Sequence, residues 1–396
     1  MFHRLTLLEK LVSFPLRAIS YLFIFDGQSR REFAYHYCKI FISRQSFASL
    51  SKLRKMILLE GERSAIIAEP TDFHGEVLLG LTNYYVDMDF KQIIVLVTPK
   101  QYERLEGAIV HHPNVIVFPL DEIFFNHVFR LRNLKVDSYF LTTLVFRTFS
   151  LKRYCKGNPH FAERVCGIVH TLKEATRPEI DNLLKSQRAF LLNNYSSDEG
   201  LKEVNTSYFH RQNKQHARQQ GDKLRFISVG IRNKKDLFNA FRAVLRVHSD
   251  AELVLIARLQ PHIPPDLVSN IHCQADKGYD VLFEEVQSSR FILALLDSKE
   301  DADLPFLRKD RSKSSGSAQL ALGLNRPMII EEAFAKCYGF TAENAVLYPV
   351  GGLKGALMQA ANMSEEAYSA MQTELSKLSE EKKVRALESL TYATRN

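Results

Sequence analysis

The chain has 396 residues, 45% of them hydrophobic and 25% charged, which is the composition expected of a soluble globular protein. A single hydrophobic core stops growing below this length, so we expect two domains. The five cysteines are odd in number, scattered and without metal-ligand spacing, which argues against a disulfide framework and indicates a reduced, cytoplasmic protein.

The net charge of +8 is concentrated in residues 1–56, which hold ten Lys or Arg and three acidic residues. The longest apolar stretch there is interrupted by Pro15 and Arg17 and is too short to span a membrane. Residues 1–60 are therefore predicted as a basic amphipathic helical extension. It either contacts an anionic membrane surface at the inner face of the cell membrane or packs on the domain behind it. No nucleic-acid-binding motif accompanies the charge, so nucleic acid is not an expected partner.

Short apolar runs alternate with longer amphipathic segments from residue 64 onward. The runs predicted as buried strands are 64–70, 92–98, 114–120, 137–144, 165–172 and 189–196. Continuous apolar strands separated by helices predict a parallel sheet covered on both faces. Residues 61–200 are thus expected to form a Rossmann-like domain. Residues 201–222 are polar and rich in Gln, and we interpret them as a linker.

The alternation restarts in residues 223–396. Strands are predicted at 224–230, 252–258, 270–275, 291–298, 326–332 and 344–350, with helices at 235–248, 280–289 and 317–325. A charged amphipathic helix over 364–390 begins at a Ser-Glu-Glu cap. The fold class is α/β: two Rossmann-like, doubly wound domains facing across a cleft. Such sheets bind ligands at the carboxyl ends of their strands.

Two segments of the second domain could seat a phosphate, although neither a GxGxxG nor a P-loop motif is present. Arg232 and Lys234 follow the first strand, where cations would meet an anion. The stretch KSSGSAQLALGLNRPMII places a collar of small residues and a lysine before a helix, whose N-terminus attracts anions. The collar residues are Lys313, Ser314, Ser315, Gly316 and Ser317. The alternatives are a solvated basic loop and an ordinary N-cap.

The loop after the first strand of the first domain, EPTDFHGEVLLG, holds Glu69, Asp72, His74 and Glu76 within eight residues. Imidazole titrates near neutral pH, so a His flanked by carboxylates can serve as a general base that activates a hydroxyl. The competing interpretation is an Asp N-cap with the His in the first helical turn.

Two DxD triplets, Asp87 with Asp89 and Asp301 with Asp303, have the oxygen ligands that a divalent cation prefers. The first falls in a helix-to-strand connection, away from the expected site. The second follows a strand, but we favour an exposed acidic turn over a metal site.

Together these residues resemble bacterial GT-B fold glycosyltransferases of capsule and lipopolysaccharide biosynthesis. The resemblance covers roughly residues 64–380 and is strongest in EPTDFHGEVLLG, KSSGSAQLALGLNRPMIIEEAFAKCYGF and NAVLY. It implies that the C-terminal domain binds a sugar nucleotide, the N-terminal domain binds the acceptor, and a final helix crosses back to the first domain. The common retaining pattern has two glutamates eight residues apart, and here Gln319 or Leu320 takes the place of the second.

The resemblance implies specific roles. His74, with Glu76 or Asp72, would act on the acceptor, while Arg232, Lys234 and the collar would contact the donor diphosphate. We therefore predict a metal-independent glycosyltransferase that moves a sugar from a nucleoside-diphosphate sugar to a hydroxyl of a surface glycan or glycolipid. The alternatives are a metal-dependent transferase using Asp301 and Asp303, and a catalytically inactive scaffold with the same fold.

Overall fold

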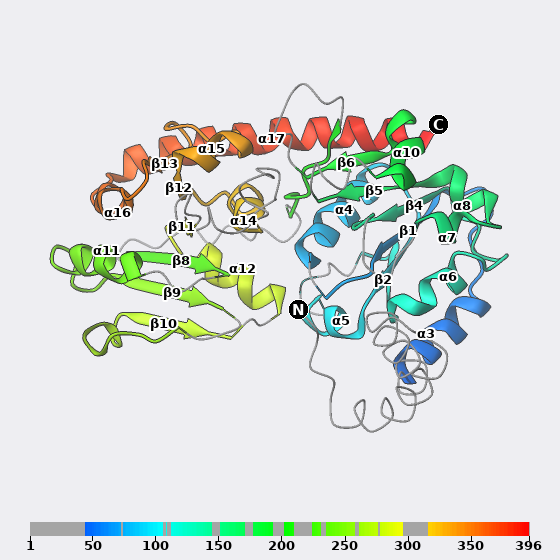
Figure 1. Ribbon diagram of the computed structural model, residues 1–396, viewed down its shortest axis with the longest axis horizontal. Coiled ribbons are helices and arrows are strands. Elements are labelled where there is room, and N and C mark those ends of the chain that lie inside the picture. Colours follow the sequence, from blue (N-terminus) through cyan, green and yellow to red (C-terminus); the bar gives the residue numbers. More distant parts are fainter. Residues whose placement is uncertain are drawn as a thin grey trace.

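The molecule consists of two α/β lobes joined by a long C-terminal helix (Figure 1). The computed structural model describes residues 44–72, 74–105, 108, 112–144, 151–170, 177–192, 202–209, 224–230, 235–257, 261–275, 278–295 and 316–395. Most of the predicted N-terminal extension, residues 1–43, therefore lies outside the described residues.

The N-terminal lobe is built on a seven-stranded parallel sheet with the order β3-β2-β1-β4-β5-β6-β7. Its strands are β1 (Ser64–Glu69), β2 (Gln92–Val97), β3 (Val115–Pro119), β4 (Ser138–Leu141), β5 (Val165–Val169), β6 (Ala189–Leu191) and β7 (Lys202–Glu203). The first six confirm the predicted strands. The strand order reverses between β1 and β4, so the carboxyl ends of these two strands flank the position where a doubly wound sheet binds ligands.

The C-terminal lobe carries a six-stranded parallel sheet with the order β10-β9-β8-β11-β12-β13. Its strands are β8 (Arg225–Val229), β9 (Glu252–Ile256), β10 (Ile271–Gln274), β11 (Phe291–Ala294), β12 (Met328–Glu331) and β13 (Ala345–Tyr348). All six predicted strands are confirmed. The reversal lies between β8 and β11, and both sheets share the doubly wound order of a Rossmann-like domain.

Helices cover both sheets (Figure 1). In the N-terminal lobe they are α3 (Arg44–Lys55), α4 (Gly75–Asp87), α5 (Pro99–Leu105), α6 (Phe125–Val128), α7 (Leu151–Cys155), α8 (Pro159–Arg164) and α10 (Asp181–Lys185), with 3-10 turns η1 (Glu122–Phe124) and η2 (Pro178–Ile180). In the C-terminal lobe they are α11 (Lys235–Leu245), α12 (Tyr279–Gln287), α14 (Gly316–Gly323), α15 (Glu332–Tyr338), α16 (Leu353–Ala361) and α17 (Glu365–Arg395), with η4 (Pro265–Leu267). The predicted cap of the last helix is confirmed, because Ser364 Oγ accepts a hydrogen bond from the backbone N–H of Ala367 at 3.2 Å.

Residues 202–209, inside the predicted linker, pack between the lobes. Residues 202 and 203 form β7, and the hydroxyl of Tyr84 on α4 donates to the carbonyl of Asn205 at 2.9 Å. A Cβ at Gly80 of α4 would lie only 1.7 Å from the carbonyl oxygen of Thr206. A Cβ at Gly323 of α14 would lie 2.2 Å from the Phe209 ring. Glycine therefore lets one helix from each lobe approach the same extended segment.

Helix α17 crosses from the second lobe to the first, as the resemblance implied. The Nζ of Lys382 lies 2.7 Å from the Glu203 carboxylate, and both side chains are nearly buried. Farther along, Lys202 lies over the Tyr392 ring, and Arg63 contacts Thr394. A continuous apolar cluster also includes residues of both lobes, such as Leu81 and Phe283, so packing and charge together hold the lobes in place.

No helix in the described part of the chain has both the length and the low charge that crossing a membrane requires.

The close approach at Gly80 predicts opposite effects for two Gly→Ala substitutions. Gly80→Ala should destabilise the protein by about 3 kcal/mol or more, since its methyl would overlap backbone that cannot yield as a side chain does. Gly355→Ala, on the exposed side of α16 with nothing within 4 Å, should stabilise by about 0.5–1 kcal/mol through helix propensity. Urea unfolding of both variants tests this, and equal effects would contradict the packing described.

Candidate active site

A buried carboxylate marks the carboxyl end of β1. Glu69 is wholly buried, and its carboxylate accepts hydrogen bonds from Thr71 N at 2.6 Å, Thr142 Oγ1 at 2.5 Å and Thr143 Oγ1 at 3.2 Å. Burial raises the pKa of Glu69 from 4.5 to about 7, although the hydrogen bonds from Thr142, Thr71 and Thr143 act in the opposite direction. The carboxyl group thus changes charge near neutral pH.

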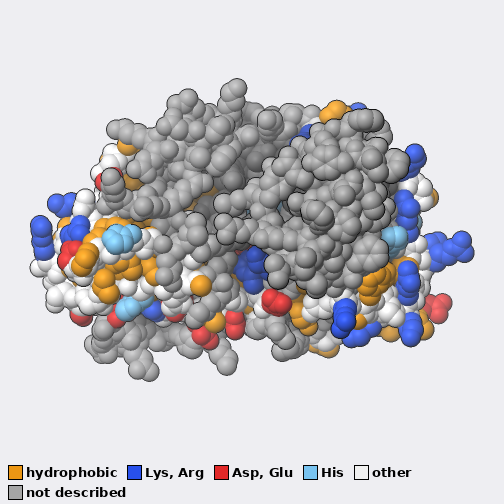
Figure 2. All heavy atoms as spheres, turned by 60° about the horizontal axis from the view of Figure 1, so that its bottom comes forward, with side chains coloured by type: hydrophobic (Ala, Val, Ile, Leu, Met, Phe, Trp, Pro, Cys, Tyr) orange, Lys and Arg blue, Asp and Glu red, His pale blue; other side chains and the backbone are white. Residues whose placement is uncertain are grey.

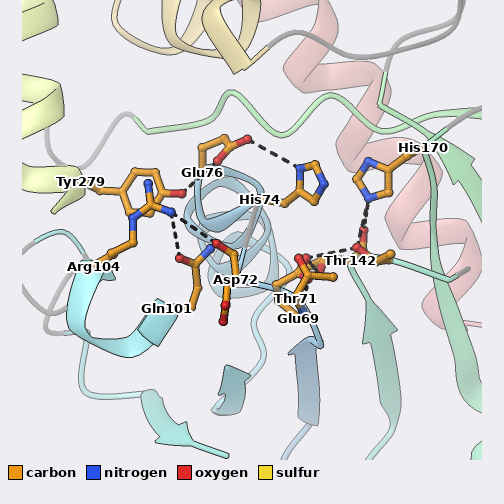
Figure 3. Close-up of polar contacts among 11 residues, drawn as sticks. Glu69, Thr71, Asp72, His74, Glu76, Gln101, Arg104, Thr142, His170 and Tyr279 are labelled. Carbon is orange, nitrogen blue, oxygen red and sulfur yellow. Dashed lines mark hydrogen bonds and ion pairs between the residues drawn. The ribbon is translucent and has the colours of Figure 1, made fainter. Parts of the chain in front are cut away.

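His74 ends the loop after β1 and is itself the N-cap residue of α4. Its backbone has φ 63 and ψ 27, the left-handed conformation that costs a non-glycine residue roughly 1–3 kcal/mol. Its carbonyl accepts a hydrogen bond from Val77 N at 3.0 Å, while its side chain makes no capping bond. The alternative with an Asp N-cap and His74 in the first turn is therefore wrong, and the imidazole points away from the helix axis into the region between the lobes (Figure 3).

The imidazole of His74 stacks on that of His170, the first residue after β5. The ring centroids are 4.3 Å apart with an interplanar angle of 22°. His170 Nε2 lies 2.8 Å from the carbonyl oxygen of Thr142 and 3.2 Å from the hydroxyl of Thr143. A carbonyl oxygen can only accept, so Nε2 carries the proton in the neutral ring. Figure 3 shows the two rings side by side above the Thr142 and Glu69 contacts.

Sequence reasoning did not identify His170, Thr142 or Thr143 as site residues, because they stood in runs interpreted as strands. The structure ends β4 at Leu141 and β5 at Val169, so all three lie just past β4, which pairs with β1, or β5, which pairs with β4. The polar residues at the ends of two apolar runs were the available signal.

Glu76 connects this site to the second lobe. One of its carboxylate oxygens lies 3.9 Å from His74 Nδ1, and the other accepts a hydrogen bond from Tyr279 Oη, on α12, at 3.1 Å. A Cβ at Gly75 would lie 2.4 Å from the Tyr279 ring, so glycine is needed for this approach. The Arg104 guanidinium lies over the same ring, 4.8 Å from its centroid.

Asp72, also predicted as a catalytic residue, lies on the α5 side of the loop. Its carboxylate accepts a hydrogen bond from Thr98 Oγ1 at 2.6 Å, and its carbonyl lies 3.4 Å from Arg104 Nη1. These contacts fix the loop that carries His74, and in Figure 3 the Asp72 carboxylate points away from the imidazole.

The described part of the predicted diphosphate site lies opposite Glu76. Gly316 begins α14, and a Cβ placed there would be 3.6 Å from Glu76 Oε1. The Ser317 hydroxyl lies 3.5 Å from the carbonyl oxygen of Val229, at the carboxyl end of β8. The start of α14 is thus close to both lobes. The other residues assigned to this site lie outside the described residues: Arg232, Lys234, Lys313, Ser314 and Ser315.

Gln319 occupies the buried side of α14. The side chain is 1% exposed, and neither its Nε2 nor its Oε1 has a hydrogen-bond partner among the described residues. The helical repeat places it on the same face as Gly316 and Gly323, which contact the first lobe and the connecting segment. A buried amide of this kind calls for a further polar partner, because leaving it unsatisfied costs about 1–3 kcal/mol.

Within the described residues, no group of three or more His, Cys, Asp or Glu side chains could hold a metal ion. Asp89 of the first DxD triplet has a positive φ and pairs with Lys91. Asp301 and Asp303 lie outside the described residues.

Comparison with known proteins identifies the fold. No family model and no curated protein matches the chain. Among solved structures, Arabidopsis thaliana UGT89C1 complexed with UDP is similar with a TM-score of 0.50 and 10% identity, covering 84% of this chain and 100% of that one. UDP-GlcNAc 2-epimerase from Neisseria meningitidis bound to UDP-GlcNAc has a TM-score of 0.48 at 14% identity, covering 83% and 99%. The glycotransferase of kitacinnamycin has a TM-score of 0.47 at 12% identity, covering 83% and 96%. The two Rossmann-like sheets and this likeness confirm the predicted GT-B fold class.

The raised pKa of Glu69 predicts a specific pH dependence of stability. The folded state holds the proton more tightly than the unfolded state, so stability falls as pH rises from about 4.5 to about 7 and does not fall further above that. The free energy of unfolding of Glu69→Gln should not fall in this way. As pH rises across this window, the difference between variant and wild type should therefore shift by about 3 kcal/mol in favour of the variant, at about 1.4 kcal/mol per pKa unit. Urea unfolding across the window measures this, with Glu388→Gln, at an exposed position of α17, as the control. If the free energy of unfolding of Glu69→Gln fell with pH as steeply as that of the wild type, Glu69 would not have the raised pKa.

Proposed function

We propose that the protein is a glycosyltransferase that moves a sugar from a nucleoside-diphosphate sugar to an acceptor hydroxyl. The main observation behind the proposal is that the Glu76 carboxylate, two residues after His74, lies close to Gly316, the first residue of α14. A helix N-terminus suits the leaving diphosphate, whose charge grows as the glycosidic bond to it breaks. An imidazole suits removal of the proton from the acceptor hydroxyl.

The donor would lie against the C-terminal lobe, with its diphosphate at Gly316 and Ser317. Lys313, Arg232 and Lys234 are proposed as the cations that complete this site, together with Ser314 and Ser315 of the collar. The unpartnered amide of Gln319 supports a polar ligand on the same face of α14. UDP in the similar Arabidopsis protein makes UDP-sugars the first donors to test.

The acceptor would lie against the N-terminal lobe. His74 is proposed as the base, Glu76 as the carboxylate that faces its Nδ1, and Asp72 as a residue that fixes the loop. A surface glycan or glycolipid is the acceptor class that we propose. Cationic residues at the helix N-terminus can balance the diphosphate without a metal ion, so we propose that activity survives EDTA.

We also propose that α3 and the residues after it face an anionic membrane surface. Lys52, Arg54 and Lys55 are exposed there, and so are Ile57 (82%) and Leu59 (55%). On the face drawn in Figure 2, Lys and Arg side chains lie among hydrophobic ones over the N-terminal lobe, at the right of the view. Basic charge beside exposed apolar side chains is the combination that binds anionic headgroups.

A His74 variant should still bind the donor but should lose most of its turnover. A sugar nucleotide that binds the folded protein raises its melting temperature by mass action, and His74→Ala should keep this shift. Its turnover should fall by about 10²–10⁴-fold, the usual contribution of a general base. His248→Ala, at a histidine that bonds Asn362 in the second lobe, is the matched control and should retain turnover.

Two results would contradict this assignment. If no UDP-, GDP-, CMP- or ADP-sugar shifted the melting temperature, the protein would not bind such donors. If Lys313→Ala kept the full wild-type shift, the diphosphate would not lie at α14.

The membrane surface has its own test. Ile57→Ser combined with Leu59→Ser should weaken sedimentation with phosphatidylserine vesicles several-fold, because both side chains are exposed and would enter the headgroup region. Val247→Ser and Val268→Ser together, at exposed apolar positions of the other lobe, provide the control. Equal binding of both double variants would exclude the surface beside α3.

A further inference from the structure

We propose that His74 and His170 share a single proton, and that the buried Glu69 side chain, acting through Thr143, balances its charge. His170 is in this account a positioning residue that acts on the acceptor through His74. The role of His74 as a base rests on the proposed function, whereas the coupling between the two rings rests on their geometry alone.

The two imidazole rings are close enough for their charges to interact. Imidazole centroids 4.3 Å apart and nearly parallel place two positive charges in van der Waals contact if both rings are protonated. Like charges this close disfavour double ionisation, so the second proton binds much more weakly than the first. The pair then titrates as a unit that holds either no proton or one proton over the physiological range.

Two hydrogen-bond partners fix the orientation of His170. Its Nε2–H donates to the Thr142 carbonyl at 2.8 Å and lies 3.2 Å from Thr143 Oγ1. These partners hold the ring where it stacks on His74. A proton that binds to His170 binds at Nδ1, because Nε2 already carries one. The positive charge is then shared by the whole ring, including the Nε2–H that contacts Thr142 and Thr143.

The Thr143 hydroxyl links the His170 ring to the buried Glu69 carboxylate. Thr143 Oγ1 lies 3.2 Å from Glu69 Oε2 and 3.2 Å from His170 Nε2. When Glu69 is ionised, the hydroxyl donates to the carboxylate and accepts from the imidazole, so one hydroxyl joins the two groups. An ionised Glu69 therefore stabilises a proton on the imidazole pair, and a neutral Glu69 does not.

Among the described residues, other ionisable groups near the pair lie on α4, α5 and α12 and in the loop after β1. Glu76 on α4 faces His74 Nδ1 at 3.9 Å, and its second oxygen is held by Tyr279 on α12. Arg104 on α5 lies over Tyr279, and the Asp72 carboxylate bonds Thr98. Glu76 thus favours a proton on His74 as Glu69 favours one on His170, and neither carboxylate removes the repulsion between two charged rings.

This arrangement suits a base that must accept one proton. In the form that accepts the proton, the two imidazoles are neutral and Glu69 is ionised. The proton from the acceptor hydroxyl then enters at His74, and the single positive charge on the pair is balanced by carboxylates on both sides. Because Glu69 is inaccessible, it contributes charge without competing for the substrate.

Histidine-selective NMR tests the coupling in the full chain. Titration of the ring Cε1–H signals from about pH 5 to about pH 9 gives the midpoints of His74 and His170 in wild type, and of the remaining ring in His74→Phe and in His170→Phe. If the rings share one proton, protonation of one ring lowers the affinity of the other for a proton. The sum of the two midpoints in wild type should then be smaller, by at least about one pH unit, than the sum of the midpoints measured for the remaining ring in the two variants. Equal sums would overturn the proposal.

The role of Glu69 needs a second comparison. In the His74→Phe background, Glu69→Gln should lower the midpoint of His170, because the balancing charge is gone. The signal of His160, which bonds the Val136 carbonyl elsewhere in the lobe, should not move. An unchanged His170 midpoint would overturn the link through Thr143. Asn replaces Phe at either position if the Phe variant loses the native amide spectrum.

The NMR midpoints test the coupling independently of the proposed function. A protein that binds no sugar nucleotide would still show the coupling, and the coupling could be absent in an active transferase. In an active enzyme, His170→Phe should also shift the pH at which kcat falls on the acid side. If the ring had only a structural role, this pH would not change.

Discussion

The close backbone approach of three segments determines how the two lobes meet. Helix α4, the extended residues 202–209 and helix α14 can lie together only because Gly80 and Gly323 carry no side chain. Neither sheet specifies this arrangement by itself. Once it is in place, the carboxyl end of β1 faces the start of α14, and residues distant in the chain come into one site.

The polar residues at this junction form a graded series from buried to exposed. Glu69 is wholly enclosed, the Glu76 side chain is 18% exposed, and the His74 side chain, on a strained backbone, is 38% exposed. Tyr279 holds Glu76 from the second lobe, so the orientation of the carboxylate depends on how the lobes meet. Domain placement and the chemistry of the histidine are therefore linked through one tyrosine hydroxyl.

The sheets could be predicted from the sequence because short apolar runs are a local signal. All twelve predicted strands are present, whereas β7 was missed because its two residues, Lys202 and Glu203, are polar and owe their place to α17. Much of the site could not be predicted in the same way. His170 and Tyr279 reach His74 and Glu76 only through tertiary contacts, which no spacing in the sequence encodes.

The central claim is that the N-terminus of α14 and the His74 loop serve one reaction. Its most direct test is a crystal structure of the protein with the nucleoside diphosphate that binds most tightly. The account predicts a phosphate oxygen within hydrogen-bonding distance of the backbone N–H groups at Gly316 and Ser317, on the side facing Glu76. A nucleotide whose phosphates lay away from α14 would contradict it.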